Sequence, residues 1–347
     1  MKIRENVALG PLTTLGVGGA ARYFVTAEDE LDVREAFHWA NEYGTDGLPL
    51  FVLGGGSNLL VSDAGFPGLV VQMAIKGVRD CGGGLFQVGA GEVWDEFVDR
   101  MVAAGMQGVE CLAGIPGSVG GTPVQNVGAY GQEVAETIVA VRAFDRRTGA
   151  FVELDREACK FRYRKSLFNA DDPERYIVTR TDFRLHPNGR AQVTYGDVKR
   201  YFAESGEAAD LGSVASVVRR IRRGKGMLII EGDPDCRSAG SFFKNPVVEA
   251  AKLPEVAAGG GVDEAAVPHW AASDGLVKLS AAWLIERAGF GKGFEDGAAG
   301  ISSRHTLALI NRGGARAADI ERLQARIQDG VRTRFAVELE REPVKLG

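Results

Sequence analysis

Two glycine-rich stretches of this 347-residue chain have compositions that suit the binding of a dinucleotide. In the first stretch, residues 48–71, an apolar run ends at Leu53 and is followed by Gly54, Gly55, Gly56, Ser57 and Asn58. Such a turn exposes successive backbone N–H groups at close range, and a pyrophosphate can bind in that nest. For the three glycines alone a plain tight turn is the favoured interpretation, and the spacing is not that of G-x-G-x-x-G.

The second stretch, residues 108–134, is long and nearly uncharged, and it contains the run GIPGSVGGTPVQNVGAYG. A backbone this rich in glycine is poor at building a core, because it has few side chains to pack. It is better suited to presenting N–H and C=O groups to a flat heterocycle. A convoluted loop without a ligand is the alternative interpretation.

Three polar side chains in separate motifs have the chemistry for an acid–base or charge-stabilising role. Arg164 lies in KFRYRKSLF (160–168), Ser241 in SAGSFFKNP (238–246) and Glu342 in VELEREPVKLG (337–347). A guanidinium grips carboxylates through paired hydrogen bonds, and hydroxyl and carboxyl groups can transfer protons. Taken one at a time, the three residues are interpreted as an ordinary surface arginine, a turn serine and a solvent-facing acid.

The elements that position these residues mix helices and strands irregularly, which predicts an α+β fold rather than a doubly wound sheet. Apolar periodicity predicts helices over 29–43, 94–102 and 320–331. Short β-rich runs predict strands at 50–53, 69–73, 86–88, 138–144, 177–185 and 307–310. The segment AAGGGV (257–262) is interpreted as a flexible surface loop.

Composition narrows the class of protein. Hydrophobic residues make up 45% and charged residues 25%, which is typical of a globular chain, and the length suggests two or three domains. The net charge of -5 argues against a general nucleic-acid binder. The chain has no signal-peptide h-region and no run of about 18 apolar residues, so we expect a cytoplasmic protein that does not bind a membrane. The scattered cysteines and histidines predict free thiols and no metal site.

The two glycine motifs together resemble the FAD-binding fold shared with the vanillyl-alcohol oxidases. Within that fold, GGGSN followed by GIPGSVGGTPVQNVGAYG is similar to the UDP-N-acetylenolpyruvoylglucosamine reductase family. The resemblance implies a two-part FAD-binding domain and a C-terminal α+β substrate-binding domain. The implied boundaries are 1–74 completed by 334–347, then 75–226, and then 227–333. No histidine lies in 48–71 or 108–134 to tether a flavin, so we expect FAD to be bound non-covalently.

The family's reaction implies a role for each of the three polar side chains. Hydride passes from NADPH to FAD, and then from flavin N5 to the β-carbon of an enolpyruvyl UDP-sugar. By the match to FxYRxSxF, Arg164 stabilises the developing enolate. Ser241 is the proton donor to the α-carbon, and Glu342 orients or recharges that serine. A register shift within Leu339-Glu340-Arg341-Glu342 would substitute Glu340 for Glu342.

The same matches assign the remaining contacts. The expected cofactor-binding residues are Gly54, Gly55, Gly56, Ser57, Asn58, Gly114, Pro116, Gly117, Gly121, Thr122, Gln125, Asn126, Gly128 and Ala129. The expected substrate-binding residues are Tyr163, Tyr195, Lys225, Asn245, Trp270 and His305. His305 is equally interpreted as a core or cap histidine. Trp270 replaces the tyrosine or phenylalanine of the lid in the family's longer type, and an indole lacks the acceptor that a phenol offers.

Two rival functions fit parts of the pattern. One is a flavin oxidase of the same fold, and the other is a non-catalytic protein that binds FAD or a nucleotide sugar. The joint presence of Arg164, Ser241 and Glu342 in separate matched motifs favours the reductase. We expect the chain to be a monomer.

Overall fold

The computed structural model describes residues 1–347, and the chain divides into two compact units. The first unit contains residues 1–7, 21–56 and 66–223, and the second contains 8–20, 57–65 and 224–347. The chain therefore crosses between the units several times. The three-part division expected from the family stays a prediction. The α+β mixture is confirmed.

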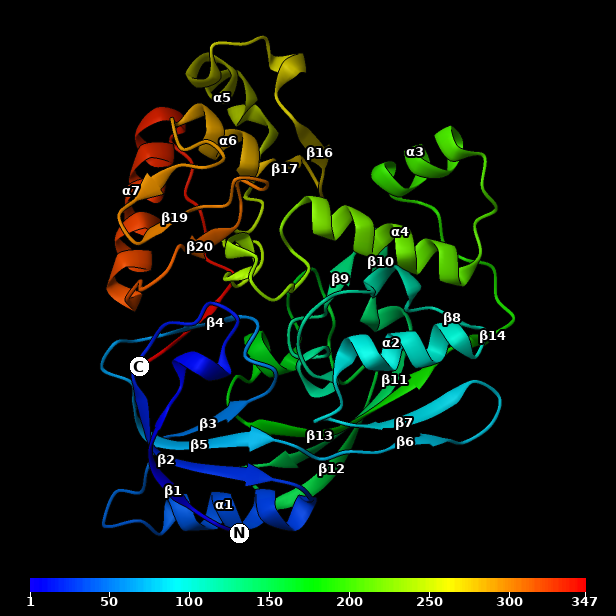
Figure 1. Ribbon diagram of the computed structural model, residues 1–347, viewed down its shortest axis with the longest axis vertical. Helices are drawn as coiled ribbons and strands as arrows, with labels where there is room; N and C mark the ends of the chain where they lie inside the picture. The colour runs from blue at the N-terminus through cyan, green and yellow to red at the C-terminus, as the bar shows by residue number, and fades with distance from the viewer. The chain divides into compact units, whose positions relative to one another are not determined.

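The first unit is built on two larger sheets and four helices (Figure 1). The four-stranded sheet has the order β1-β2-β5-β3, in which β2, β5 and β3 are parallel, and the five-stranded sheet has the antiparallel order β12-β11-β13-β7-β6. Short pairs join β9 with β10 and β8 with β14. The bounds are β1 Arg4–Ala8, β2 Ala20–Ala27, β3 Leu50–Leu53, β5 Phe66–Met73, β6 Val78–Asp80, β7 Leu85–Gly89, β8 Met106–Gln107, β9 Gly128–Ala129, β10 Gln132–Glu133, β11 Ile138–Asp145, β12 Ala150–Asp155, β13 Tyr176–Arg184, β14 His186–Pro187, α1 Glu30–Asn41, α2 Trp94–Ala103, α3 Gly196–Ser205 and α4 Leu211–Gly224.

The second unit packs three helices with two three-stranded sheets and one strand pair. The sheets have the orders β15-β17-β16 and β18-β19-β20, and β21 runs parallel to β4. The bounds are β4 Leu59–Val61, β15 Val247–Glu249, β16 His269–Ala271, β17 Leu276–Leu279, β18 Glu295–Asp296, β19 Ala299–Ile301, β20 Leu309–Asn311, β21 Val344–Leu346, α5 Leu253–Gly260, α6 Ala281–Arg287 and α7 Ala317–Phe335.

The helix α1 illustrates how local sequence sets an element. Asp29 is its N-cap, and the Asp29 carboxylate accepts a hydrogen bond of 2.9 Å from the N–H of Asp32. Val33, Ala36 and Phe37 follow at helical spacing and are buried. The helices predicted over 29–43, 94–102 and 320–331 are confirmed as α1, α2 and α7, and the six predicted strands all overlap observed strands.

The segment predicted as a surface loop at 257–262 is wrong. Residues 257–260 are the last turn of α5, and Ala257 and Gly260 are buried. A Cβ on Gly260 would lie 2.4 Å from the ring of Trp283, so only glycine permits this close packing. Gly261, with φ of +65°, then ends the helix. The small residues form a helix because tertiary packing outweighs their weak local preference.

No helix of the structure has the length and apolar character needed to span a bilayer. All four cysteines are free, as predicted: Cys81 is exposed, and Cys111, Cys159 and Cys236 are buried.

Candidate active site

The two glycine stretches meet inside the first unit. A Cβ on Gly55, just after β3, would lie 2.5 Å from the Cα of Gly117, and a Cβ on Gly54 would lie 2.6 Å from the Oγ of Ser118. At Gly55 the obstacle is backbone, so glycine is required where the two backbones touch, whereas at Gly54 the obstacle is the end of the Ser118 side chain. Two runs some sixty residues apart thus pack directly against each other, and the backbone amides of such glycine-rich runs can bind an anion.

Ser118 supplies a direct test of whether this surface suits a bound ligand. Its Oγ is buried and has no hydrogen-bond partner within the protein. A buried hydroxyl left in this state costs free energy, and most such groups in native proteins are satisfied. The hydroxyl adjoins Gly54, where the first stretch is expected to receive a pyrophosphate. The unsatisfied donor and the glycine-lined contact fit FAD.

Several residues expected to bind the cofactor instead have polar groups engaged within the protein. The N–H of Gly114 donates to Asp95 at 2.6 Å, and its carbonyl accepts from Arg222 Nε at 2.9 Å. Thr122 is buried, and its hydroxyl donates to the carbonyl of Val119 at 2.8 Å. These bonds fix the path of the second stretch. Contact of Gly114 and Thr122 with the cofactor stays a prediction.

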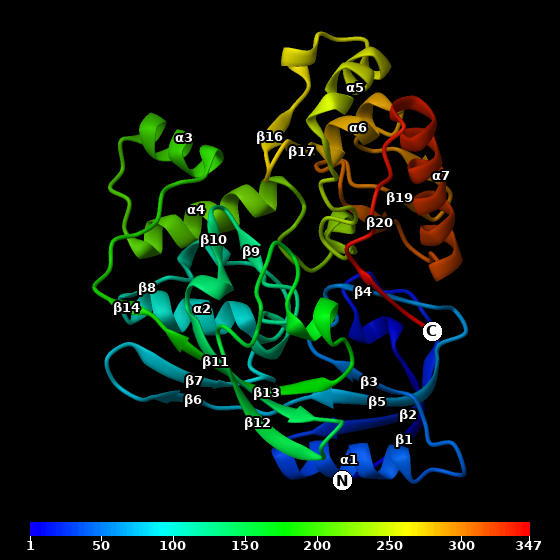
Figure 2. The same ribbon diagram turned by 180° about the vertical axis from the view of Figure 1, so that it is seen from behind.

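Arg222, in α4, was missed by sequence reasoning. The run RRIRRGKG reads as a basic surface turn, yet Arg222 is buried and burial lowers the pKa of its guanidinium. The helix runs close to β9 and β10 in both views (Figures 1 and 2). Periodicity was the available signal, since Val214, Val218 and Arg222 follow at intervals of four and all are buried. A cation on the buried face of a helix indicates polar groups in the interior. Here Arg222 donates a hydrogen bond to the carbonyl of Gly114.

Arg164 lies at the tip of a tight turn in the first unit. The backbones of Arg162 and Lys165 pair with each other, and Arg164 has a φ of +56°. One guanidinium nitrogen, Nη2, donates to the carbonyl of Gly128 at 2.8 Å, so the arginine reaches the second glycine stretch. Tyr163 is 44% exposed, and its ring lies 5.5 Å from the Arg164 guanidinium carbon.

Tyr195 precedes α3 and is also 44% exposed. Its ring packs edge-on against Tyr130 of the second stretch, with the ring centroids 5.3 Å apart. Tyr195 and Arg164 therefore both contact the second glycine-rich stretch, Tyr195 at Tyr130 and Arg164 at Gly128.

In the second unit, Ser241 and Glu342 lie on neighbouring extended segments. Phe243 pairs antiparallel with Arg341, and the N–H of Glu342 donates to the carbonyl of Phe242 at 2.9 Å. The backbone of Glu342 is therefore bonded one residue away from Ser241. Glu340 pairs with Lys244 instead, through a 2.5 Å ion pair, and its side chain is 68% exposed. The backbone pairing thus brings Glu342 close to Ser241, and the role of either acid stays a prediction.

Lys225 and His305 both adjoin an ion-pair cluster that the sequence did not reveal. Arg304 binds Asp233 at 2.6 Å and Asp235 at 2.9 Å, and the hydrogen bond from Arg304 to Asp233 holds the pKa of Asp233 below its usual value. A Cβ on Gly226 would lie 3.1 Å from the Nε of Arg304, so the chain passes close to the cluster directly after Lys225. His305 follows Arg304, and the backbone N–H of His305 donates to Ser302 Oγ at 3.2 Å.

The remaining predicted residues of the second unit make contacts with other residues of that unit. Asn245 accepts a 3.0 Å hydrogen bond from the N–H of Ala281, the first residue of α6. Asn58 lies beside Glu342, because its Nδ2 donates to the Glu342 carbonyl at 3.4 Å, and the carbonyl of Ser57 accepts from Thr14. Trp270, in β16, is 51% exposed, with the Nζ of Lys278 5.9 Å from its ring.

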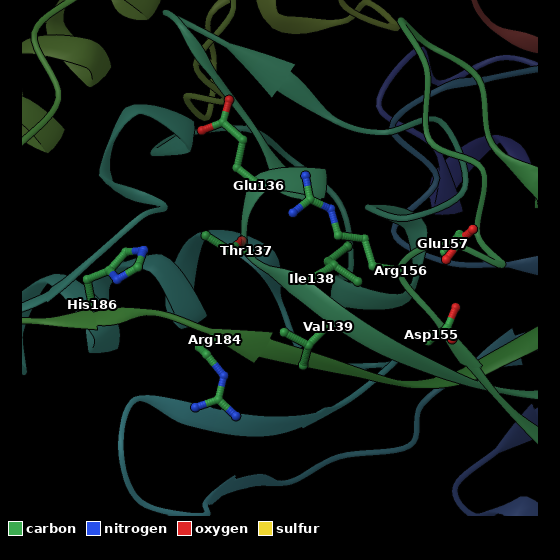
Figure 3. Close-up of a pocket in the computed structure, with 9 residues that line it drawn as sticks. All are labelled: Glu136, Thr137, Ile138, Val139, Asp155, Arg156, Glu157, Arg184 and His186. Atoms are coloured by element: carbon green, nitrogen blue, oxygen red, sulfur yellow. The ribbon is translucent and has the colours of Figure 1, made fainter.

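A pocket of about 420 Å³ in the first unit contains none of the predicted site residues (Figure 3). Its lining mixes the guanidinium groups of Arg156 and Arg184 and the imidazole of His186 with carboxylates such as Glu136 and Asp155. In Figure 3 the two guanidinium groups point in different directions rather than toward a common point. This arrangement selects neither an anion nor a cation.

Comparisons with known proteins agree with the geometry of the site. Residues 21–155 match the FAD binding domain family, and residues 233–346 match the family described as UDP-N-acetylenolpyruvoylglucosamine reductase, C-terminal domain. The chain is 46% identical to the UDP-N-acetylenolpyruvoylglucosamine reductase of Streptomyces coelicolor, over 99% of this chain and 90% of that protein. It is 47% identical to that of Saccharopolyspora erythraea, over 97% of this chain and 94% of that protein.

The chain also matches the crystal structure of UDP-N-acetylenolpyruvylglucosamine reductase (MurB) from Thermus caldophilus. The match has a TM-score of 0.68 and 30% sequence identity, and it covers 100% of each chain. Apart from residues 57–65, the FAD-binding match lies on the unit in which the two glycine stretches meet. Full-length identity of this size, together with both family matches, establishes that this chain belongs to the UDP-N-acetylenolpyruvoylglucosamine reductase family, whose members are FAD-dependent oxidoreductases.

Proposed function

We propose that this chain reduces UDP-N-acetylglucosamine enolpyruvate to UDP-N-acetylmuramate in peptidoglycan precursor synthesis, with NADPH as the hydride source. The chemistry supplied by bound FAD is hydride transfer, from the nicotinamide to the β-carbon of the enol ether. Gly54, Gly55 and Gly117, with the unsatisfied hydroxyl of Ser118, are the residues that would hold the cofactor. The family membership and the acid–base pair of the second unit support the proposal.

Arg164 is the charge-stabilising residue in this proposal. Addition of hydride to the β-carbon leaves negative charge on the α-carbon and its carboxylate. A guanidinium is always charged and binds a carboxylate through two parallel hydrogen bonds, so it stabilises that charge as it develops. The bond from Arg164 to the Gly128 carbonyl limits where the guanidinium can lie.

Ser241 donates the proton to the α-carbon, and Glu342 orients Ser241 or restores its proton. The observation that carries this assignment is the backbone bond between Glu342 and Phe242, which brings the acid next to the residue that follows Ser241. A hydroxyl is a weak acid, but a carbanion is a strong base, so proton transfer is downhill once the geometry is fixed.

The decisive experiment separates the two half-reactions of Ser241→Ala by stopped-flow absorbance of the flavin band. Reduction by NADPH involves no proton donation to carbon and should keep nearly its normal rate. Reoxidation by the enolpyruvyl substrate should slow by at least about 10²–10⁴-fold, since a positioned acid is lost. Ser241→Cys should recover part of the rate. Equal slowing of both halves would make Ser241 a structural residue near the flavin and overturn the assignment.

A matched pair of variants tests the register of the acid. Glu342→Gln should slow reoxidation, whereas Glu340→Gln should not, because Glu340 is exposed and bound to Lys244. The reverse pattern would move the role to Glu340.

A further inference from the structure

Asn126 joins three segments of the first unit through a buried side chain. It is 1% exposed and has a φ of +45°, which is uncommon for a residue with a Cβ. Its Nδ2 donates to Glu133 Oε2 at 2.8 Å and to the carbonyl of Arg162 at 3.1 Å, and its Oδ1 accepts from the N–H of Ala135 at 3.2 Å. Both amide hydrogens are therefore engaged within the protein.

The bond from Asn126 to the carbonyl of Arg162 secures one side of the turn that carries Arg164. Two residues after Arg164, the hydroxyl of Ser166 donates to the carbonyl of Val124 at 2.5 Å, and Ser166 is fully buried. The turn is thus anchored to the second glycine stretch both before and after Arg164. Arg164 itself reaches the same stretch through Gly128.

This double anchorage matches what the conformation of Arg164 demands. Holding a residue other than glycine in the left-handed region costs free energy, and such a residue persists only where surrounding bonds determine it. A long arginine side chain also loses rotamer freedom when it is fixed. Without the anchors, the turn would relax and the guanidinium would sample many positions.

We propose that Asn126 is a positioning residue for Arg164 rather than a ligand of FAD, and that Ser166 secures the same turn from its other side. The proposal rests on the proposed function, because it assigns to Asn126 the placing of the cation that stabilises the enolate. Since a misplacement of about 1 Å can cost on the order of 10²-fold in rate, weakening either anchor affects the step that uses Arg164.

The first test is a double-mutant cycle on the holoenzyme. Asn126→Ala should slow reoxidation by the enolpyruvyl substrate by about 10–100-fold and leave flavin reduction by NADPH and the Kd for FAD within about threefold. In the Arg164→Ala background, Asn126→Ala should cause no further slowing, because both changes act through one guanidinium. Additive slowing, or loss of FAD affinity, would overturn the proposal. If Arg164→Ala alone left reoxidation unchanged, the proposed role of Arg164 would fail, and that failure is a separate one.

The second test uses trypsin on the holoenzyme and is independent of activity. Arg162, Arg164 and Lys165 are cleavage sites on the anchored turn, so Asn126→Ala should speed cutting between 162 and 166 by about tenfold or more as local opening becomes easier. Ser166→Ala should do the same, which keeps the test informative if Asn126→Ala folds poorly. Asn311→Ala is the matched control, since Asn311 is also buried and bonded to several backbone groups, but in the second unit. Equal protection of this turn in wild type and in both variants would refute the anchorage.

Discussion

The contact between Gly55 and Gly117 offers a direct measure of how tightly the two glycine stretches are packed. In Gly55→Ala, the new Cβ would lie 2.5 Å from the Gly117 Cα, 2.8 Å from its carbonyl carbon and 3.1 Å from the N of Ser118. Carbon atoms prefer separations of about 3.5–4.0 Å, so the two backbones have to move apart by roughly 1 Å. Gly55 does not have a positive φ, so the penalty is steric and comes without backbone strain. Overpacking of this kind costs about 1–3 kcal/mol.

The assay is urea unfolding of the apoprotein followed by titration with FAD. Gly55→Ala should lower the unfolding midpoint, and it should weaken FAD binding because the displaced backbones no longer match the cofactor; each 1.4 kcal/mol of binding free energy lost in this way raises the Kd about tenfold. For the unfolding midpoint alone, Gly121→Ala in the second stretch is the control, since its Cβ would meet nothing nearer than Ser118 Oγ at 3.9 Å. A Gly55→Ala protein with the midpoint and FAD affinity of wild type would refute the inference that the two stretches form the cofactor surface.

Two further predictions concern ionisable groups. Cys81 alone should react with a thiol reagent in the folded protein, and three more thiols should react after denaturation. The reason is that Cys111, Cys159 and Cys236 are buried, and burial raises the pKa of Cys111 and Cys159 to about 12. Labelling of two or more thiols in the native protein would contradict this prediction. Hydrogen bonds from Arg175 lower the pKa of Asp145 to about 2, so its stabilising effect is present above the unfolded pKa of about 4 and is lost as the pH falls through 2. The difference in unfolding free energy between wild type and Asp145→Asn should therefore shrink over that interval, and a constant difference would exclude the ion pair as its source.

Capping residues and apolar spacing were enough to predict the helices and strands that are determined by interactions between residues close together in the chain. The helix α1 follows from Asp29 as a cap and from an apolar stripe, and β3 was predicted at its observed bounds. The last turn of α5 was not predictable in this way, because Ala257 is buried and Gly260 packs against Trp283, a residue more than twenty positions away. Sequence periods report on neighbours within a few residues, whereas close packing across the fold depends on distant ones.

The predictions about the site also divide into those that short motifs could make and those that they could not. Motifs indicated which residues to consider, but the contact of Gly55 with Gly117, the burial of Arg222 and the bond between Arg162 and Asn126 all join segments far apart in the chain. No spacing rule within one segment could have revealed them. Asn126 is the instructive example, since its motif suggested a cofactor contact and its hydrogen bonds point inward.

The parallel pairing of β4 with β21 has a consequence for protein synthesis. Residues 59–61 emerge from the ribosome early, yet their partner strand is residues 344–346, and most of the second unit lies after residue 223. At about 5–20 residues per second, β4 waits roughly 15–60 seconds for that partner. During this interval the exposed edge of Leu59, Leu60 and Val61 is a site for mispairing or for a chaperone. Expression yield should therefore respond to translation speed and chaperone supply more strongly than the stability of the finished protein would suggest.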